Sequence, residues 1–126
     1  MAIKHPTAEQ LELPSILSAL GDSTRLAMIG RLADVAELSC GQFSELGSKT
    51  VLSYHMAKLR EAGLIQVRAQ STRRFVSLRR AELDERFPGL LATIVPAAKA
   101  VETPRKVSEA PITPLARTDS YDWIVD

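Results

Sequence analysis

The chain has 126 residues, with 16 lysines and arginines against 15 aspartates and glutamates, so its formal net charge is +1. This length predicts a single domain, and no segment approaches the roughly 20 consecutive apolar residues of a membrane span. A single cysteine, Cys40, excludes an internal disulfide, and the N-terminus lacks an apolar leader, so we expect a cytoplasmic protein.

Helix-capping patterns predict the first elements of the chain. Residues 7–10 (TAEQ) fit the S/T-x-x-E/Q capping box, a helix is expected over residues 14–20, and Asp22 is placed to cap the next helix. The apolar residues of this next helix that recur at helical spacing, and that we expect to be buried, are Leu26, Ile29, Leu32 and Ala33.

A second capping box at residues 39–42 (SCGQ) predicts a short helix that ends near Leu46. Gly47 is expected to close this helix in the left-handed conformation. Ser48 is then placed to cap a longer helix over residues 49–62.

The helix over residues 49–62 has an apolar face and an opposite face of unusual composition. At 100° per residue, the apolar face carries Leu52, His55, Met56 and Leu59. The opposite face carries Thr50, Ser53, Tyr54, Ala57 and Glu61. A solvated helix would alternate Glu and Lys there, so these small and adaptable side chains predict a helix that lies against a partner.

After Gly63 the apolar period changes from 3.6 to 2, which predicts a β-hairpin over residues 65–79 with a basic tip. Residues 81–101 return to helical spacing, and Pro96 is expected to kink or divide this last helix. Three further prolines predict that residues 103–126 form an extended tail, which ends in SYDWIVD.

Charge is concentrated in the middle of the chain. Residues 49–80 carry eight basic side chains and one acidic one, a net charge of +7, between two segments of −3 each. A run that is merely solvated usually mixes signs, so this block predicts a polyanion-binding face.

The order of short helix, glycine turn, second helix and basic hairpin is that of a winged helix-turn-helix. Its second helix can approach base edges in the major groove only if its exposed side chains are small or hydrogen-bonding, and arginines at the hairpin suit the neighbouring minor groove. We therefore expect a mainly α-helical fold with a small β-hairpin that binds double-stranded DNA.

Three segments resemble the ArsR/SmtB family of bacterial transcriptional repressors: LGDSTRLAMIGRLAD (20–34), SKTVLSYHMAKLREAGLI (48–65) and STRRFVSLRR (71–80). The resemblance covers about residues 11–100. It implies a homodimer formed through the first and last helices, bound to an imperfect inverted repeat, with repression released by a signal. Tyr54 replaces a histidine that is frequent in the family, which implies a different base preference.

The candidate site residues follow from these expectations. Those assigned to DNA contact are Ser48, Lys49, Thr50, Ser53, Tyr54, Ala57, Lys58, Arg68, Ser71, Thr72, Arg73 and Arg74. Those assigned to dimerisation are Ile16, Leu17, Leu20, Leu90, Leu91, Ile94 and Ala98. We expect residues 1–102 to form the DNA-binding and dimerisation domain.

No metal or other cofactor and no catalytic site are expected. The resemblance implies two features that metal sensors of the family share and this chain lacks. Those sensors carry a Cys-x-Cys pair, where this chain has Cys40 alone. They also carry histidines in the last helix, where this chain has no histidine. No Ser/His/Asp order, glycine-rich phosphate loop or carboxylate pair indicates an enzyme.

Several residues allow two interpretations. His55 is either a ligand or general base, or a hydrogen-bonded structural histidine, which we favour. Cys40 is either an oxidation sensor or a packed thiol, and packing is favoured. Arg25 either reaches a phosphate or binds an intramolecular partner such as Asp22 or a carboxylate of the partner subunit. His5 is expected to lie in a mobile terminus.

The last predicted helix and the tail each allow two interpretations as well. Leu90, Leu91 and Ile94 either line a pocket for a hydrophobic inducer or, as we favour, form the dimer interface. The apolar tail residues either fold back onto a groove of the dimer or dock on another protein; they are Tyr121, Trp123, Ile124 and Val125. A protein-interaction module on a winged-helix scaffold is therefore the alternative to a DNA-binding regulator.

Overall fold

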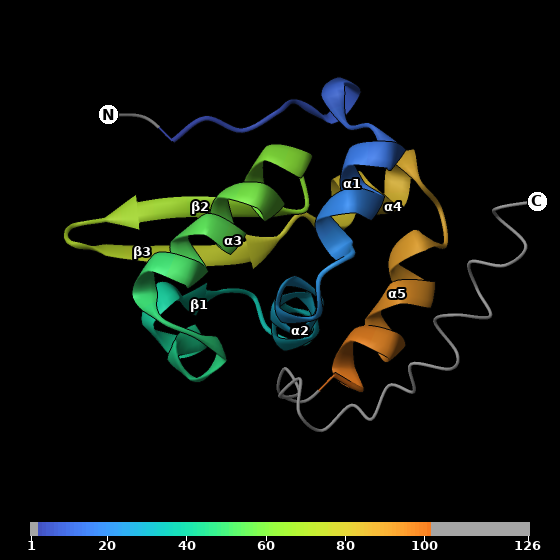
Figure 1. Ribbon diagram of the computed structural model, residues 1–126. Coiled ribbons are helices and arrows are strands. Elements are labelled where there is room, and N and C mark those ends of the chain that lie inside the picture. The colour runs from blue at the N-terminus through green and yellow to red at the C-terminus, as the bar shows by residue number, and fades with distance from the viewer. Residues whose placement is uncertain (1–2, 102–126) are drawn as a thin grey trace, which may run out of the picture.

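The computed structural model describes residues 3–101, and the predicted tail lies outside this range. Figure 1 shows helices gathered on one side of the molecule, with a β-hairpin projecting from the other. The α-helices are α1 (Leu13–Leu20), α2 (Ser23–Leu32), α3 (Lys49–Ala62), α4 (Arg80–Arg86) and α5 (Leu90–Lys99). The other elements are strands β1 (Leu38–Ser39), β2 (Ile65–Gln70) and β3 (Arg73–Leu78) and 3-10 helices η1 (Ala8–Gln10) and η2 (Cys40–Leu46).

The predicted caps at Asp22 and Ser48 are confirmed. The Asp22 carboxylate accepts two backbone N–H groups at the start of α2, and the Ser48 hydroxyl accepts the N–H of Val51 at 3.2 Å. The left-handed cap predicted at Gly47 is wrong. Its φ of 160° is extended backbone, since η2 leads directly into the extended N-cap of α3.

The predicted apolar face of α3 is buried in the core, His55 included. Gly63 ends α3 in the left-handed conformation, with φ of 88°. A Cβ at Gly63 would lie 2.0 Å from Cδ2 of the buried Leu11, so both the backbone and the packing of the N-terminal segment require glycine here.

The sheet has the order β1-β3-β2 and is antiparallel throughout. The predicted hairpin is confirmed, with Gln70 opposite Arg73 and a two-residue turn in which Ser71 has φ of 59°. Strand β1 was not expected from the sequence, because two residues are too short to show a period. It pairs with the middle of β3 and joins the hairpin to η2.

Four residues assigned to the dimer interface belong to the core of the protomer itself. Ile16, Leu20, Leu91 and Ala98 are at most 7% exposed. Helix α5 packs closely on α2 at Gly30, where the missing side chain leaves room for the α5 backbone. A Cβ at this position would lie 2.8 Å from the carbonyl oxygen of Ala98. These apolar side chains are therefore already removed from water before any second chain binds.

Pro96 does not divide the last helix, which runs through it from Leu90 to Lys99. A short α4 precedes this helix, and Gly89 with φ of 87° separates the two. The partly exposed apolar residues that remain on α5 include Leu90 and Ile94.

The N-terminal segment is tied to the domain, so the expectation of a free end at His5 is wrong. The Nε2 atom of His5 accepts the backbone N–H of Val67 on β2 at 2.9 Å. Three arginine side chains donate to carbonyl oxygens of the same segment: Arg60 to Lys4, Arg79 to Pro6, and Arg86 to Ala8 and Leu11.

This anchoring predicts a pH-dependent stability. Burial, together with the nearby Arg60 and Arg79 guanidinium groups, lowers the pKa of His5 below its ordinary value of 6.5. Only the neutral ring can accept the Val67 N–H, so His5 stabilises the fold above about pH 6.5 and loses this effect as pH falls through its lowered pKa.

We expect His5→Ala to lower the free energy of unfolding by about 1 kcal/mol at pH 7.5 and by less at pH 5. Urea unfolding of both proteins at the two pH values measures the difference, and any contribution of His55 cancels between them. An equal loss at both pH values would contradict the role of the neutral imidazole.

Candidate nucleic-acid interface

One arginine fixes α3 against the two preceding helices. Arg25, on α2, donates from Nε to the carbonyl oxygen of Ala19 on α1 at 2.6 Å. Its Nη1 lies 3.0 Å from Nδ1 of the buried His55 on α3. A guanidinium can only donate, so His55 accepts this hydrogen bond at Nδ1, which assigns the N–H of the imidazole to Nε2.

The predicted structural role of His55 is therefore confirmed. Asp22, which caps α2, lies 3.8 Å from the Nε2 atom of His55. The expected partner Asp22 accepts only the backbone N–H of Arg25, and the Arg25 side chain binds Ala19 and His55 instead. These bonds position the exposed face of α3 from beneath.

The exposed surface of α3 includes two adjacent rows at helical spacing, besides the exposed Val51 and Glu61. The first row faces the hairpin and carries Lys49, Ser53, Ala57 and Arg60. The second row faces away from the hairpin and carries Thr50, Tyr54 and Lys58. Tyr54 is 57% exposed, and the ammonium of Lys58 lies 5.5 Å from the centre of its ring.

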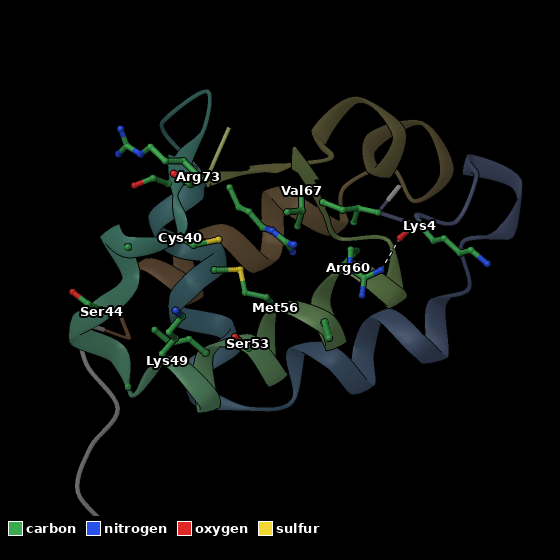
Figure 2. A pocket seen from close by; sticks show the side chains of 17 residues that line it. Lys4, Cys40, Ser44, Lys49, Ser53, Met56, Arg60, Val67 and Arg73 are labelled. Atoms are coloured by element: carbon green, nitrogen blue, oxygen red, sulfur yellow. Dashed lines mark hydrogen bonds between the residues drawn. The ribbon is translucent and has the colours of Figure 1, made fainter. Parts of the chain in front are cut away.

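A cleft of about 1130 Å³ separates the first row of α3 from the hairpin. Figure 2 shows Cys40 and Met56 within the cleft, with Lys49 and Ser53 to one side and Arg73 to the other. The residues of other elements that line it are Ile3, Lys4, Ser39, Cys40, Gly41, Ser44, Gly47, Val67, Thr72, Arg73 and Arg74.

The cleft has one sign of charge. The cationic residues that line it are Lys4, Lys49, Arg60, Arg73 and Arg74. The guanidinium of Arg73 lies 5.5 Å from the centre of the Phe75 ring, which also carries the Arg68 guanidinium at 4.7 Å. Arg74 is therefore the hairpin arginine on the Val67 face of the strand pair. None of the described residues that line it is acidic. A concave surface with this charge attracts phosphates, and the field is strengthened between low-dielectric walls.

The cleft brings together only part of the predicted DNA-contact set. Lys49, Ser53, Ala57, Thr72, Arg73 and Arg74 line it. Ser48 and Ser71 are exposed at the start of α3 and at the hairpin turn. Arg68 is not among the lining residues, since it alternates with Val67 along β2, and its guanidinium binds Glu37 at 2.6 Å and Gln70 at 2.6 Å.

Sequence reasoning missed Lys4 and Arg60 in the cleft. Arg60 could have been found, because it continues the row of Lys49, Ser53 and Ala57 by one helical turn. Lys4 carries no such signal, since only the anchoring of the N-terminal segment brings it there.

Cys40 lies in the cleft as a partly buried thiol. Burial raises the pKa of this thiol, and the nearby Arg74 guanidinium opposes the rise only in part. The thiolate is the reactive form, so this environment favours the packing interpretation of Cys40 over that of an oxidation sensor.

Residues 3–101 contain neither a metal-binding cluster nor a membrane-spanning helix. No three His, Cys, Asp or Glu side chains in this range gather closely enough to hold a metal ion. None of its helices has the length and apolar character needed to cross a bilayer.

The fold and the basic cleft define a winged helix-turn-helix DNA-binding protein, and comparisons with known proteins agree. A family model described as a helix-turn-helix domain matches residues 20–68. The uncharacterized HTH-type transcriptional regulator YceK of Bacillus subtilis (strain 168) is 44% identical over 82 residues, which are 63% of this chain and 82% of that protein.

The solved structure of HlyU from Vibrio cholerae N16961 is also similar. Its TM-score is 0.53 at 30% sequence identity, over 64% of this chain and 88% of that one. The chain belongs to the ArsR family of helix-turn-helix transcriptional regulators, which act by binding DNA and are not enzymes.

The position of Arg25 predicts a specific stability defect. In Arg25→Lys the single ammonium group cannot reach both the Ala19 carbonyl and His55, so a partly buried polar atom loses its partner. We expect the free energy of unfolding to fall by about 1–3 kcal/mol, measured by urea unfolding.

The matched control is Arg31→Lys on the same helix, where Arg31 pairs with the exposed Glu45. Such a surface pair contributes about 0–1 kcal/mol, so the control should stay close to the wild type. Equal destabilisation of the two variants would contradict a special role for Arg25.

Proposed function

We propose that the protein acts as a homodimer that represses transcription from an inverted-repeat operator. In this proposal α3 enters the major groove and the β2–β3 hairpin follows the adjacent backbone or minor groove. The observation that supports it is the cleft between these two elements, which is lined by five cationic residues and by no acidic residue among those described.

The two exposed rows of α3 suit different parts of the DNA. Lys49 and Ser53 lie beside the cleft, where they can contact phosphates and base edges. Tyr54 and Lys58 extend the surface away from the hairpin, where Tyr54 can contact a base or sugar. Arg68 is left out of the proposed contacts, because Glu37 already neutralises its charge.

The proposed dimer is supported by an apolar surface on α1 and α5. Leu13 and Leu17 lie one turn apart on α1 and are 39% and 49% exposed. Leu90 and Ile94 on α5 are partly exposed, and Figure 1 shows both helices on the side away from the hairpin tip. Covering these side chains would place two copies of α3 on one face of the DNA.

The cleft predicts which substitutions weaken DNA binding uniformly. Arg73→Ala and Arg74→Ala should each weaken binding to all sequences and reduce the slope of log affinity against log salt concentration by about 1. Ser53→Ala should instead change the preference among operator sequences. Fluorescence anisotropy on operators selected from random oligonucleotides, at several salt concentrations, measures both effects.

Arg68→Gln is the matched control for the hairpin arginines, since it removes the same charge from the same hairpin. It should leave the salt slope nearly unchanged. A slope that falls as much for Arg68→Gln as for Arg74→Ala would place the DNA on the other side of the hairpin.

The apolar surface predicts the effect of a charge at Leu17. Leu17→Glu should convert the dimer to a monomer of 13.8 kDa and weaken operator binding, as measured by light scattering and anisotropy. Val35→Glu is the control, because Val35 is similarly exposed at 42% but lies outside α1 and α5. Dimers of unchanged stability in both variants would exclude this interface.

A further inference from the structure

The cleft has a property that phosphate binding does not require. Its surface is mainly apolar between the cationic side chains, with Ile3, Cys40, Met56 and Val67 contributing from four separate segments. The phosphates of a DNA backbone can use the cations, but they do not need the apolar floor. The combination suits a ligand that is both anionic and apolar.

The chain itself contains such a ligand. Residues 118–126 (TDSYDWIVD) hold three aspartates and no lysine or arginine, together with Tyr121, Trp123, Ile124 and Val125. The negative charge of this segment is opposite to the positive charge of the cleft. Its large apolar side chains also match the mainly apolar floor of the cleft. No other segment of the sequence combines acidic and aromatic residues in this way.

We propose that residues 118–126 dock in the cleft between α3 and the hairpin and compete there with DNA. The proposal rests on the proposed function, because it assigns the same cations to operator phosphates. The aspartates lie against the cationic side chains in place of phosphates, and the aromatic and aliphatic residues cover the apolar floor. The tail thus holds a fraction of the protein in a form that cannot bind its operator.

The length of the connecting segment permits this contact. Residues 102–117 span up to about 50 Å when extended, which exceeds the radius of gyration of roughly 13 Å for a domain of this size. A tethered segment has an effective concentration on the order of millimolar, so even weak docking is populated. Operator DNA must then displace the tail, which lowers the apparent affinity by the fraction of free clefts.

The first test compares two full-length variants that each lose two negative charges. Asp119→Asn/Asp122→Asn removes charge from the docking segment, and Glu102→Gln/Glu109→Gln removes it from the connecting segment. If the tail occupies the cleft about four-fifths of the time, the first variant should bind operator DNA roughly fivefold more tightly. The second should match the wild type.

The second test uses Trp123, the only tryptophan of the chain. Docked in the cleft of the full-length protein, its fluorescence should be blue-shifted and protected from acrylamide. Saturating operator DNA should reverse both effects. Asp119→Asn/Asp122→Asn should weaken the protection without DNA.

The outcomes separate the two proposals. Failure of the wild type and of every tail variant to bind selected DNA would overturn the proposed function. Specific DNA binding that is equally tight in all variants would overturn only the docking of the tail. A protected Trp123 that DNA does not expose would likewise overturn it, because the tail would then lie outside the cleft.

Discussion

The pair of hydrogen bonds that the Arg25 guanidinium makes to Ala19 and to His55 is the interaction on which the position of α3 depends. It joins the end of α1 to the middle of α3, and it uses α2, which Asp22 caps, as the rigid support. Because the guanidinium can only donate, it also sets the tautomer of His55 and keeps this side chain in the core. The exposure of Ser53 and Tyr54 to solvent therefore depends on a bond made on the opposite face of the helix.

The basic block of the sequence serves two purposes that charge alone does not separate. Arg60 and Arg79 donate to carbonyl oxygens of the N-terminal segment, Arg68 binds Glu37, and Arg80 binds the carbonyl of Ala33. The remaining hairpin arginines, Arg73 and Arg74, line the cleft. The charge of this block predicts a polyanion-binding region, but four of its eight basic side chains also have intramolecular partners that stabilise the fold.

The same cleft connects regulation to recognition. Its walls come from α3, η2, the hairpin and the N-terminal segment, so any ligand that fills it can contact both elements of the proposed DNA interface, α3 and the hairpin. Occupation by the acidic tail would couple the affinity for DNA to anything that binds or modifies the tail. Burial raises the pKa of Cys40 in the same cleft, which makes its thiol less reactive.

Local patterns in the sequence determined the winged helix-turn-helix, its caps at Asp22 and Ser48, the buried face of α3 and the basic hairpin, because each depends on residues a few positions apart. Only the tertiary structure decided that Ile16 and Ala98 are buried within one protomer, that His5 and Lys4 lie against the hairpin and α3, and that Arg68 binds Glu37. The hydrogen bonds among these contacts join residues 31 to 62 positions apart, and the buried apolar residues lie on faces of different packed helices. Helical or strand periodicity identifies an apolar face or a charged side chain, but it carries no information about which partner occupies the space beside it.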